Sequence, residues 1–150
     1  MHDSLKERCA SLSIEAVADE VRRASAWLEA VCTEHRVPAA QLMRLDLCLN
    51  EALGNIISHG GSGVTSGPVL LRVEVDANQD LGRATLTVTD GGTPFDPVAA
   101  VPAPRPRSLQ EAEPGGLGLL MMRESADALS YHLVAGRNEL AIMVQWASLG

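Results

Sequence analysis

The stretch from Leu45 to Gly60 carries two helical periodicities at once. Its apolar positions, extended one turn upstream, recur at helical spacing and are Leu42, Leu45, Leu49, Leu53 and Ile56. At about 100° per residue these positions form one stripe, which is typical of a helix that buries one side. Glu51, Asn55 and His59 lie on successive turns and form a polar ridge roughly opposite that stripe. The stretch therefore predicts a helix whose polar ridge is either a chemical site or a solvated surface.

Two further helices are predicted from the same kind of spacing. Ser13 is a candidate N-cap for a helix that begins at Ile14 and ends near His35. Pro38 fits the first turn of the central helix, which then continues to His59. Helical spacing returns at Leu119 and continues to about Ala126. We expect these three helices to lie on one face of a sheet.

Alternation of β-branched and polar residues predicts two hairpins. Their strands are expected at residues 69–75, 83–89, 129–134 and 139–146. The first pair is joined by the turn-rich sequence ANQDLG and the second by Ala-Gly-Arg-Asn at 135–138. Residues 4–12 add a weakly marked edge strand. Because strands are adjacent in sequence, we expect an α+β two-layer sandwich with the helices on one face of a mixed, mainly antiparallel sheet.

Two glycine-rich segments interrupt these patterns. Residues 60–68 have the sequence GGSGVTSGP, which does not sustain regular structure and predicts a loop. Residues 91–118 are dominated by Gly, Pro and Ala, and a stretch of this length without periodicity is usually a binding loop or lid. We expect one domain over residues 1–150, because this length suits a single hydrophobic core.

Composition excludes several classes of partner. The formal net charge of −7 argues against nucleic acid, because no basic cluster is present to release counterions from phosphates. No membrane contact is expected, since the chain has no apolar run of about 18 residues and no signal peptide. Cys9, Cys32 and Cys48 form no CxxC pair. We expect reduced thiols in a cytoplasmic protein.

Two short motifs outside the central helix are candidates for ligand binding. Asp90 ends a predicted strand and is followed by Gly91 and Gly92, so a carboxylate stands where the backbone can approach a ligand closely. Residues 115–118 open the last helix, where free N–H groups and the helix dipole favour an anion such as phosphate. Each motif alone also fits an ordinary turn or loop.

Taken in order, the three motifs form a specific set. The segments LDLCLNEALGNIISHG, VTDGGTPFDP and GGLGLLMMRESAD follow one another along the chain. This set resembles the Bergerat-fold ATP-binding module of the histidine-kinase-like (GHKL) ATPase family. Within that family it resembles the anti-sigma regulatory factor serine/threonine kinases. The resemblance covers roughly residues 10–146 and implies ATP and Mg²⁺ as cofactors.

The resemblance also implies roles for individual residues. Glu51 resembles the general base that takes a proton from the attacking hydroxyl, and Asn55 resembles the Mg²⁺ ligand. Asp90 resembles the residue that binds the adenine amino group. Further nucleotide contacts are implied for Gly92, Phe95, Gly116, Leu117 and Gly118. A lid over the nucleotide is implied for residues at about 98–114.

The function implied by the resemblance is regulatory phosphorylation. Such a protein phosphorylates Ser or Thr of an antagonist (STAS-like) protein in a partner-switching pathway, and it binds that antagonist and in some cases a sigma factor. A homodimer is a further expectation. One alternative is a nucleotide-dependent binding module without kinase activity, which the same pocket would serve. The other is a detached histidine-kinase ATPase domain, against which stands the lack of a dimerisation helix with a phospho-accepting His.

Overall fold

The computed structural model describes residues 9–59, 67–92, 94, 96 and 116–147. Their elements follow in the order β1 (Cys9–Ile14), α2 (Ala18–Glu34), α3 (Ala39–His59), β2 (Val69–Ala77), β3 (Leu81–Asp90), α4 (Gly116–Ser125), β4 (Ala128–Val134) and β5 (Arg137–Ala147). Among these residues, no helix combines the length and the apolar character that crossing a membrane requires.

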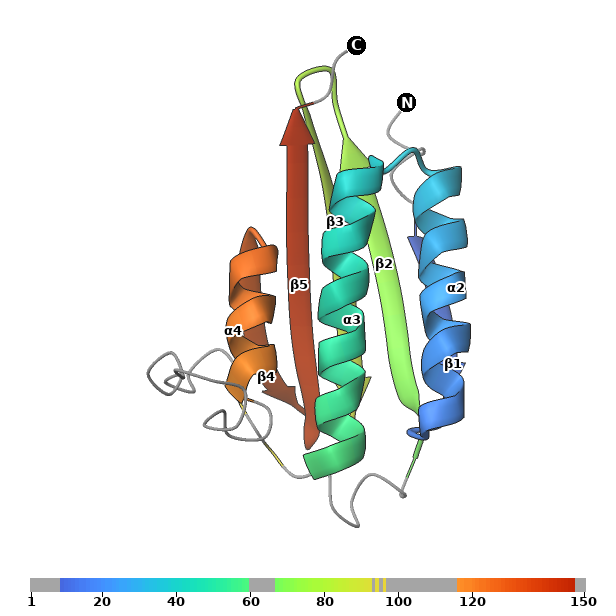
Figure 1. Ribbon diagram of the computed structural model, residues 1–150, viewed down its shortest axis with the longest axis vertical. Helices are drawn as coiled ribbons and strands as arrows, with labels where there is room; N and C mark the ends of the chain where they lie inside the picture. The colour runs from blue at the N-terminus through green and yellow to red at the C-terminus, as the bar shows by residue number, and fades with distance from the viewer. Residues whose placement is uncertain (1–8, 60–66, 93, 95, 97–115, 148–150) are drawn as a thin grey trace.

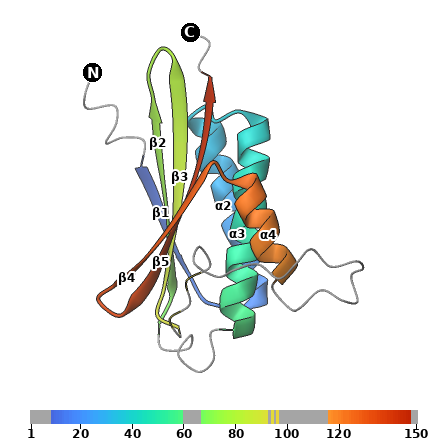
Figure 2. The same ribbon diagram turned by 90° about the vertical axis from the view of Figure 1, so that its left-hand side faces the viewer.

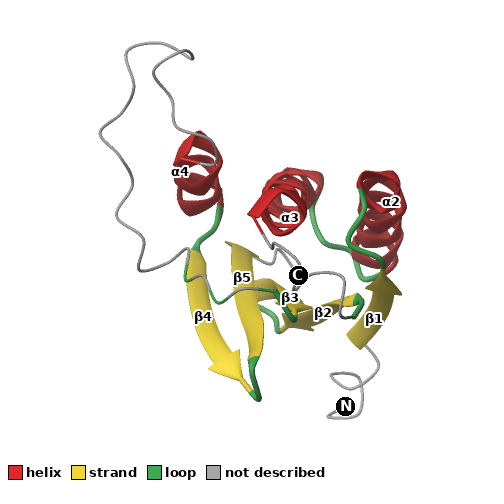
Figure 3. Cartoon of the chain, turned by 90° about the horizontal axis from the view of Figure 1, so that it is seen from below, coloured by secondary structure: helices red, strands yellow, loops and turns green. Residues whose placement is uncertain are grey.

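The strands form one sheet in the spatial order β1-β2-β3-β5-β4 (Figure 1). All four pairings between the described strands are antiparallel. Helices α2, α3 and α4 lie in a row over the same face of this sheet, as the edge-on view and the view from below show (Figures 2 and 3). The predicted two-layer α+β architecture with a mainly antiparallel sheet is therefore confirmed.

The core lies between the two layers and is built from two matching periodicities. The apolar stripe of α3 supplies Leu45, Leu49 and Leu53, each at most 1% exposed. Strand β2 alternates buried and exposed residues along most of its length, as expected for a strand with one covered face. Its inward residues, together with those of β3 and β5, are Val69, Leu71, Val73, Val75, Ala84, Leu86, Val88, Leu140, Ile142 and Val144. The apolar faces of the helices and of the strands therefore point at one another.

The predicted start of the first helix is wrong by four residues. Ser13 does not cap a helix, because Ser13 and Ile14 continue β1 and pair with Leu70 and Val69 of β2. Ile14 is buried at 3% exposure. Helix α2 begins only at Ala18, after Val17, and has no side-chain cap. The buried strand position outweighs the capping preference of Ser13.

The predicted helix end near His35 is confirmed and has a clear local cause. Arg36 adopts a left-handed backbone conformation with φ of 62°. The N–H of Val37 donates to the carbonyl of Cys32 at 2.8 Å, and the N–H of Arg36 donates to that of Thr33 at 3.2 Å. This pair of bonds is the Schellman motif, which usually has glycine where Arg36 stands. The sequence therefore marks this end only weakly.

Two other predicted boundaries need correction. The loop expected to reach Gly118 ends earlier, because α4 already begins at Gly116. The last hairpin turn is also shorter than the predicted 135–138. Only Ala135 and Gly136 form it, with φ of 52° and 78°, and β5 begins at Arg137. Two consecutive positive φ values are those of a type I′ turn, which matches the twist of a hairpin.

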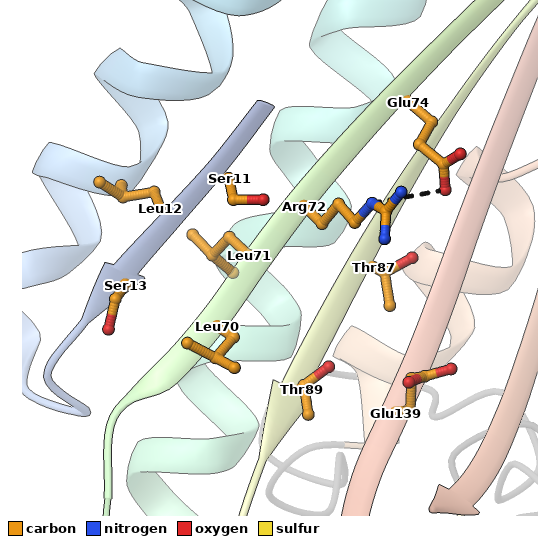
Figure 4. A pocket seen from close by; sticks show the side chains of 10 residues that line it. All are labelled: Ser11, Leu12, Ser13, Leu70, Leu71, Arg72, Glu74, Thr87, Thr89 and Glu139. Atoms are coloured by element: carbon orange, nitrogen blue, oxygen red, sulfur yellow. Dashed lines mark ion pairs between the residues drawn. The ribbon is translucent and has the colours of Figure 1, made fainter. Parts of the chain in front are cut away.

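The face of the sheet opposite the helices carries a shallow groove of about 440 Å³. Figure 4 shows it lined largely by hydroxyl and charged side chains, with the helices behind the strands. Arg72 and Glu74 form an ion pair at 3.7 Å in it, and Leu70 lies on its floor at 45% exposure. No residue predicted for nucleotide binding lines this groove.

Gly82 is required by close packing rather than by backbone conformation. It pairs with Trp146 across β3 and β5, and a Cβ at position 82 would lie 2.1 Å from the indole. We expect Gly82→Ala to lower the free energy of unfolding by about 1–3 kcal/mol, because the indole must move. Gly54→Ala is the control, since a Cβ on that glycine of α3 meets nothing within 4 Å. It should stabilise the protein by roughly 0.5–1 kcal/mol. Urea unfolding of both variants measures this, and equal effects would contradict it.

Candidate functional site

Residues of three predicted motifs lie toward the same end of the molecule. The last turns of α3, the first turn of α4 and the end of β3 all lie at the lower end in Figure 1. Glu51 and Asn55 lie on α3, Gly118 on α4 and Asp90 at the end of β3. The connections that precede and follow these termini run through residues outside the described part of the chain.

Helices α3 and α4 run antiparallel and touch along what we call the α3–α4 seam. The seam consists of three residue pairs, one on each successive turn: Arg44 with Ser125, Cys48 with Met122, and Glu51 with Gly118. From one pair to the next the residue number in α3 rises while the residue number in α4 falls, as antiparallel packing requires. The polar ridge of α3 therefore faces a neighbouring helix at Glu51 and is not simply a solvated surface.

Glu51 and Gly118 approach each other closely. A Cβ on Gly118 would lie 2.1 Å from Glu51 Oε2 and 3.0 Å from its Cδ. Gly118 is buried and Glu51 half-buried. The first turn of α4 contains no acidic residue, and among the described residues the Glu51 carboxylate places a negative charge near this positive end of the helix dipole.

Cys48 occupies the middle of the seam as a neutral thiol. Burial raises its pKa to about 11, and the negative charge of Glu51 adds to this while Arg44 opposes it. Its Sγ lies 3.7 Å from the carbonyl oxygen of Met122, to which the thiol donates. Cys32 is likewise buried and its pKa is raised to about 11, first by burial and then by Asp46. Neither thiol is ionised at neutral pH, so neither is a nucleophile there.

Asp90 stands in a tight and well-connected turn. Its Oδ1 accepts from the N–H of Gly92 at 2.8 Å and from the side-chain amide of Asn138 at 3.2 Å. The same amide nitrogen donates to the carbonyl of Gly92 at 3.2 Å. Asp90 is 8% exposed and Asn138 is 7% exposed. Within the described residues both of these hydrogen bonds end on Oδ1.

Asn138 and Tyr131 are residues that the sequence patterns missed. Asn138 pairs with Asp90 in the β3–β5 ladder, and its Oδ1 accepts from the hydroxyl of Tyr131 on β4. The sequence pattern predicts a turn at Asn138, where a polar residue needs no special explanation. The signal that would have found it is the two-residue turn at 135–136, which makes Asn138 a strand residue opposite Asp90.

Several predicted residues lie partly or wholly outside the described chain. Phe95 and the predicted lid at 98–114 are not among the described residues, nor are the side chains of His59 and Leu117. Gly116 begins α4. Asn55 is half-buried, one turn after Glu51 on the same side of α3. The described contacts bring Glu51 to Gly118 and Asp90 to Gly92, as two separate groups.

These groups fit an adenine nucleotide with Mg²⁺. Gly92 and Asn138 hold the Asp90 carboxylate through Oδ1, and a carboxylate fixed in this way suits recognition of an amino group. The described residues contain no group of three or more His, Cys, Asp or Glu side chains that would hold a metal on its own. Mg²⁺ is usually held by one or two oxygen-bearing side chains, mostly carboxylates, and completes its shell with phosphate and water oxygens. Asn55 would be the protein ligand in such an arrangement.

A second network fixes α4 against α3 and the sheet, and we call it the Arg44–Asp127 anchor. Arg44 donates to the carbonyl of Ser125 at 2.6 Å and to Asp127 Oδ1 at 3.0 Å. Asp127 Oδ2 accepts from the N–H of Gln145 at 2.7 Å. Desolvation pushes the pKa of Asp127 up, but the hydrogen bond from Gln145 and the bond and charge of Arg44 outweigh it. The pKa therefore lies below its ordinary value.

The sequence matches known proteins over most of its length. The family model of the histidine kinase-like ATPase domain matches residues 14–144. The chain is 35% identical over 133 residues to serine/threonine-protein kinase BtrW of Bordetella bronchiseptica, a match that covers 88% of this chain and 90% of that protein. The crystal structure of the RsbU and RsbW domains of Rv1364c from Mycobacterium tuberculosis is similar over 93% of this chain, with a TM-score of 0.65 and 13% identity. This chain spans 33% of that one, and the likeness concerns the fold.

We expect Asp127→Asn to lower the free energy of unfolding by about 1–2 kcal/mol at pH 7, because it removes the charge from both bonds of the anchor. The control is Asp76→Asn, whose carboxylate lies 3.8 Å from Arg83 with both side chains half exposed. It should cost less than about 0.5 kcal/mol. Chemical unfolding of wild type and both variants measures these differences.

The difference in free energy of unfolding between wild type and Asp127→Asn should depend on pH with a definite sign. The pKa of Asp127 is lowered in the folded state from its ordinary value of 3.8. Its charge therefore stabilises the fold above that value, and the contribution is lost as the pH falls through the lower folded-state pKa. The gap between wild type and Asp127→Asn should stay constant from pH 7 to about 5 and shrink below roughly 4. A gap that widens in acid would contradict this assignment.

Proposed function

The chain belongs to the histidine kinase-like ATPase domain family, and we propose that it is an ATP-dependent protein serine/threonine kinase of the anti-sigma type. Its substrate would be a serine or threonine hydroxyl on an antagonist (STAS-like) protein in a partner-switching pathway. Support comes from a relative that is named a serine/threonine-protein kinase and is 35% identical over nearly the whole of both chains.

The observation that carries this proposal is the position of the Glu51 carboxylate. It lies against Gly118 in the first turn of α4, where unpaired backbone N–H groups attract phosphate. Phosphoryl transfer needs the attacking hydroxyl to be oriented and its proton accepted, and it needs little covalent help. A carboxylate beside a phosphate-binding helix end supplies that need.

Each residue would then have a separate task. Bound MgATP would supply the phosphoryl group, and its Mg²⁺ ion would neutralise negative charge on that group during transfer. Asn55 would hold the Mg²⁺ ion, and Asp90 would accept a hydrogen bond from the adenine amino group. Glu51 would accept the proton of the substrate hydroxyl while the hydroxyl oxygen forms a bond to the γ-phosphorus. The bond from that phosphorus to the bridging oxygen breaks, and ADP leaves with that oxygen.

The proposed partners are those that the resemblance to anti-sigma regulatory factor kinases implies. They are the antagonist protein and, in the regulatory state, a sigma factor or a comparable regulator. A homodimer in the cytoplasm is part of this proposal. The competing function is a nucleotide-dependent binding module without transfer, and the two predictions below separate it from a kinase.

Glu51→Gln and Glu51→Ala are expected to lower the rate of phosphotransfer to the antagonist by roughly 10²–10⁴-fold, because the proton acceptor is lost. The affinity for ATP should change by less than about threefold, since the base acts on the hydroxyl rather than on bound nucleotide. Radiolabelled transfer and calorimetric titration measure the two quantities. Full transfer by Glu51→Ala would eliminate Glu51 as the base.

Asp90→Asn is expected to weaken ATP and ADP binding at least about tenfold. The asparagine replaces one acceptor oxygen by an NH₂ donor, so the adenine amino group would meet a donor or lose its acceptor. Asp76→Asn, on the exposed surface of β2, is the matched control and should bind as wild type. The measurement is calorimetric titration with and without Mg²⁺. If folded wild type binds neither nucleotide, the kinase proposal fails. Binding without transfer to any antagonist would favour the binding module.

A further inference from the structure

We propose that Gly118 is a positioning residue that keeps open the space in which the Glu51 carboxylate stands. This inference rests on the proposed role of Glu51 as proton acceptor. It gives Gly118 a task different from contact with phosphate. The glycine would define the place of the base, and so act on the rate of transfer rather than on nucleotide affinity.

The distances around Gly118 support this task directly. The three nearest atoms to a Cβ at this position all belong to the side chain of Glu51: Oε2 at 2.1 Å, Cδ at 3.0 Å and Cγ at 3.8 Å. A separation of 2.1 Å is far inside van der Waals contact, so the two groups cannot both occupy these positions. Any residue other than glycine at 118 therefore competes with the carboxylate for one volume.

The other contacts of the α3–α4 seam indicate whether Glu51 or helix α4 would move when a side chain is added at position 118. Helix α4 is held at its other end by the Arg44–Asp127 anchor, in which Arg44 donates to the carbonyl of Ser125 at 2.6 Å and to Asp127. Cys48 contacts Met122 between that end and Gly118, and Met122 is 1% exposed. The carboxylate of Glu51 is the end of a flexible side chain, and no hydrogen bond to it is found within the described residues. A methyl group at 118 should therefore turn Glu51 away and leave α4 in place.

This consequence separates the proposal from a phosphate-contact role. If Gly118 serves only to let the backbone approach phosphate, Gly118→Ala loses ATP affinity and transfer together. If Gly118 keeps the place of Glu51, Gly118→Ala keeps affinity and loses the rate of the chemical step. Shortening residue 51 by one methylene then relieves the conflict, so Glu51→Asp should largely mask the effect of Gly118→Ala.

The experiment compares wild type, Gly118→Ala, Glu51→Asp, the double variant and Gly54→Ala. Gly54→Ala makes the same chemical change in α3, where a Cβ meets nothing within 4 Å. We expect Gly118→Ala to lower single-turnover phosphotransfer at least about tenfold, with the ATP dissociation constant changed less than about threefold. The double variant should transfer within about threefold of Glu51→Asp alone. Gly54→Ala should match wild type in both quantities.

Crystal structures of wild type and Gly118→Ala give a readout that does not depend on kinase activity. The Glu51 carboxylate should lie beside position 118 in wild type and turn away in the variant. If wild type transfers no phosphate but the carboxylate moves in this way, the proposed function fails and the positioning contact stands. The inference is overturned if the carboxylate keeps its place, if affinity falls with the rate, or if the two substitutions act independently. It is also overturned if Gly118→Ala loses more than about 5 °C in Tm, since α4 would then have yielded.

Discussion

Burial of the apolar stripe of α3 on the sheet is the constraint on which the site depends. Leu45, Leu49 and Leu53 are almost completely withdrawn from solvent between the helices and the strands. Since side chains on a helix cannot rotate independently about its axis, this burial also fixes where the polar ridge points. At Glu51 the ridge points at α4, and the Arg44–Asp127 anchor holds α4 in register with it. Core packing and site geometry are therefore one arrangement.

Sequence periodicity predicted the two layers because the central elements α3 and β2 are amphipathic in the ordinary way. Strand β2 alternates buried and exposed positions, and the stripe of α3 has a period close to that of the helix. The errors fall where tertiary context outweighs a local preference. Ser13 is a good cap in isolation, but the buried neighbour Ile14 belongs to the β1–β2 ladder. The end of α2 was predicted correctly, although Arg36 adopts there a left-handed conformation in which glycine is usual.

The candidate site was predictable only in part, for a different physical reason. Motifs identified Glu51 from the polar ridge of α3, and Asp90 and Gly118 because each stands at an element end with a recognisable composition. They carried no information about contacts between elements that are distant in sequence. That Asn138 supports Asp90 follows from strand register, and that Gly118 abuts Glu51 follows from how two helices pack. Both facts need the assembled sheet and helix layer.

The two ends of the site are held in contrasting ways, and the way in which Asp90 is held suits its proposed task. Asp90 is fixed by hydrogen bonds from Gly92 and Asn138, and Tyr131 in turn holds Asn138, so one carboxylate oxygen has a defined direction. A group that distinguishes one base from another benefits from such rigidity, because an unmet hydrogen bond then penalises the wrong base. Glu51 is confined in a different way, by steric contact with Gly118, and within the described residues no hydrogen bond holds its carboxylate.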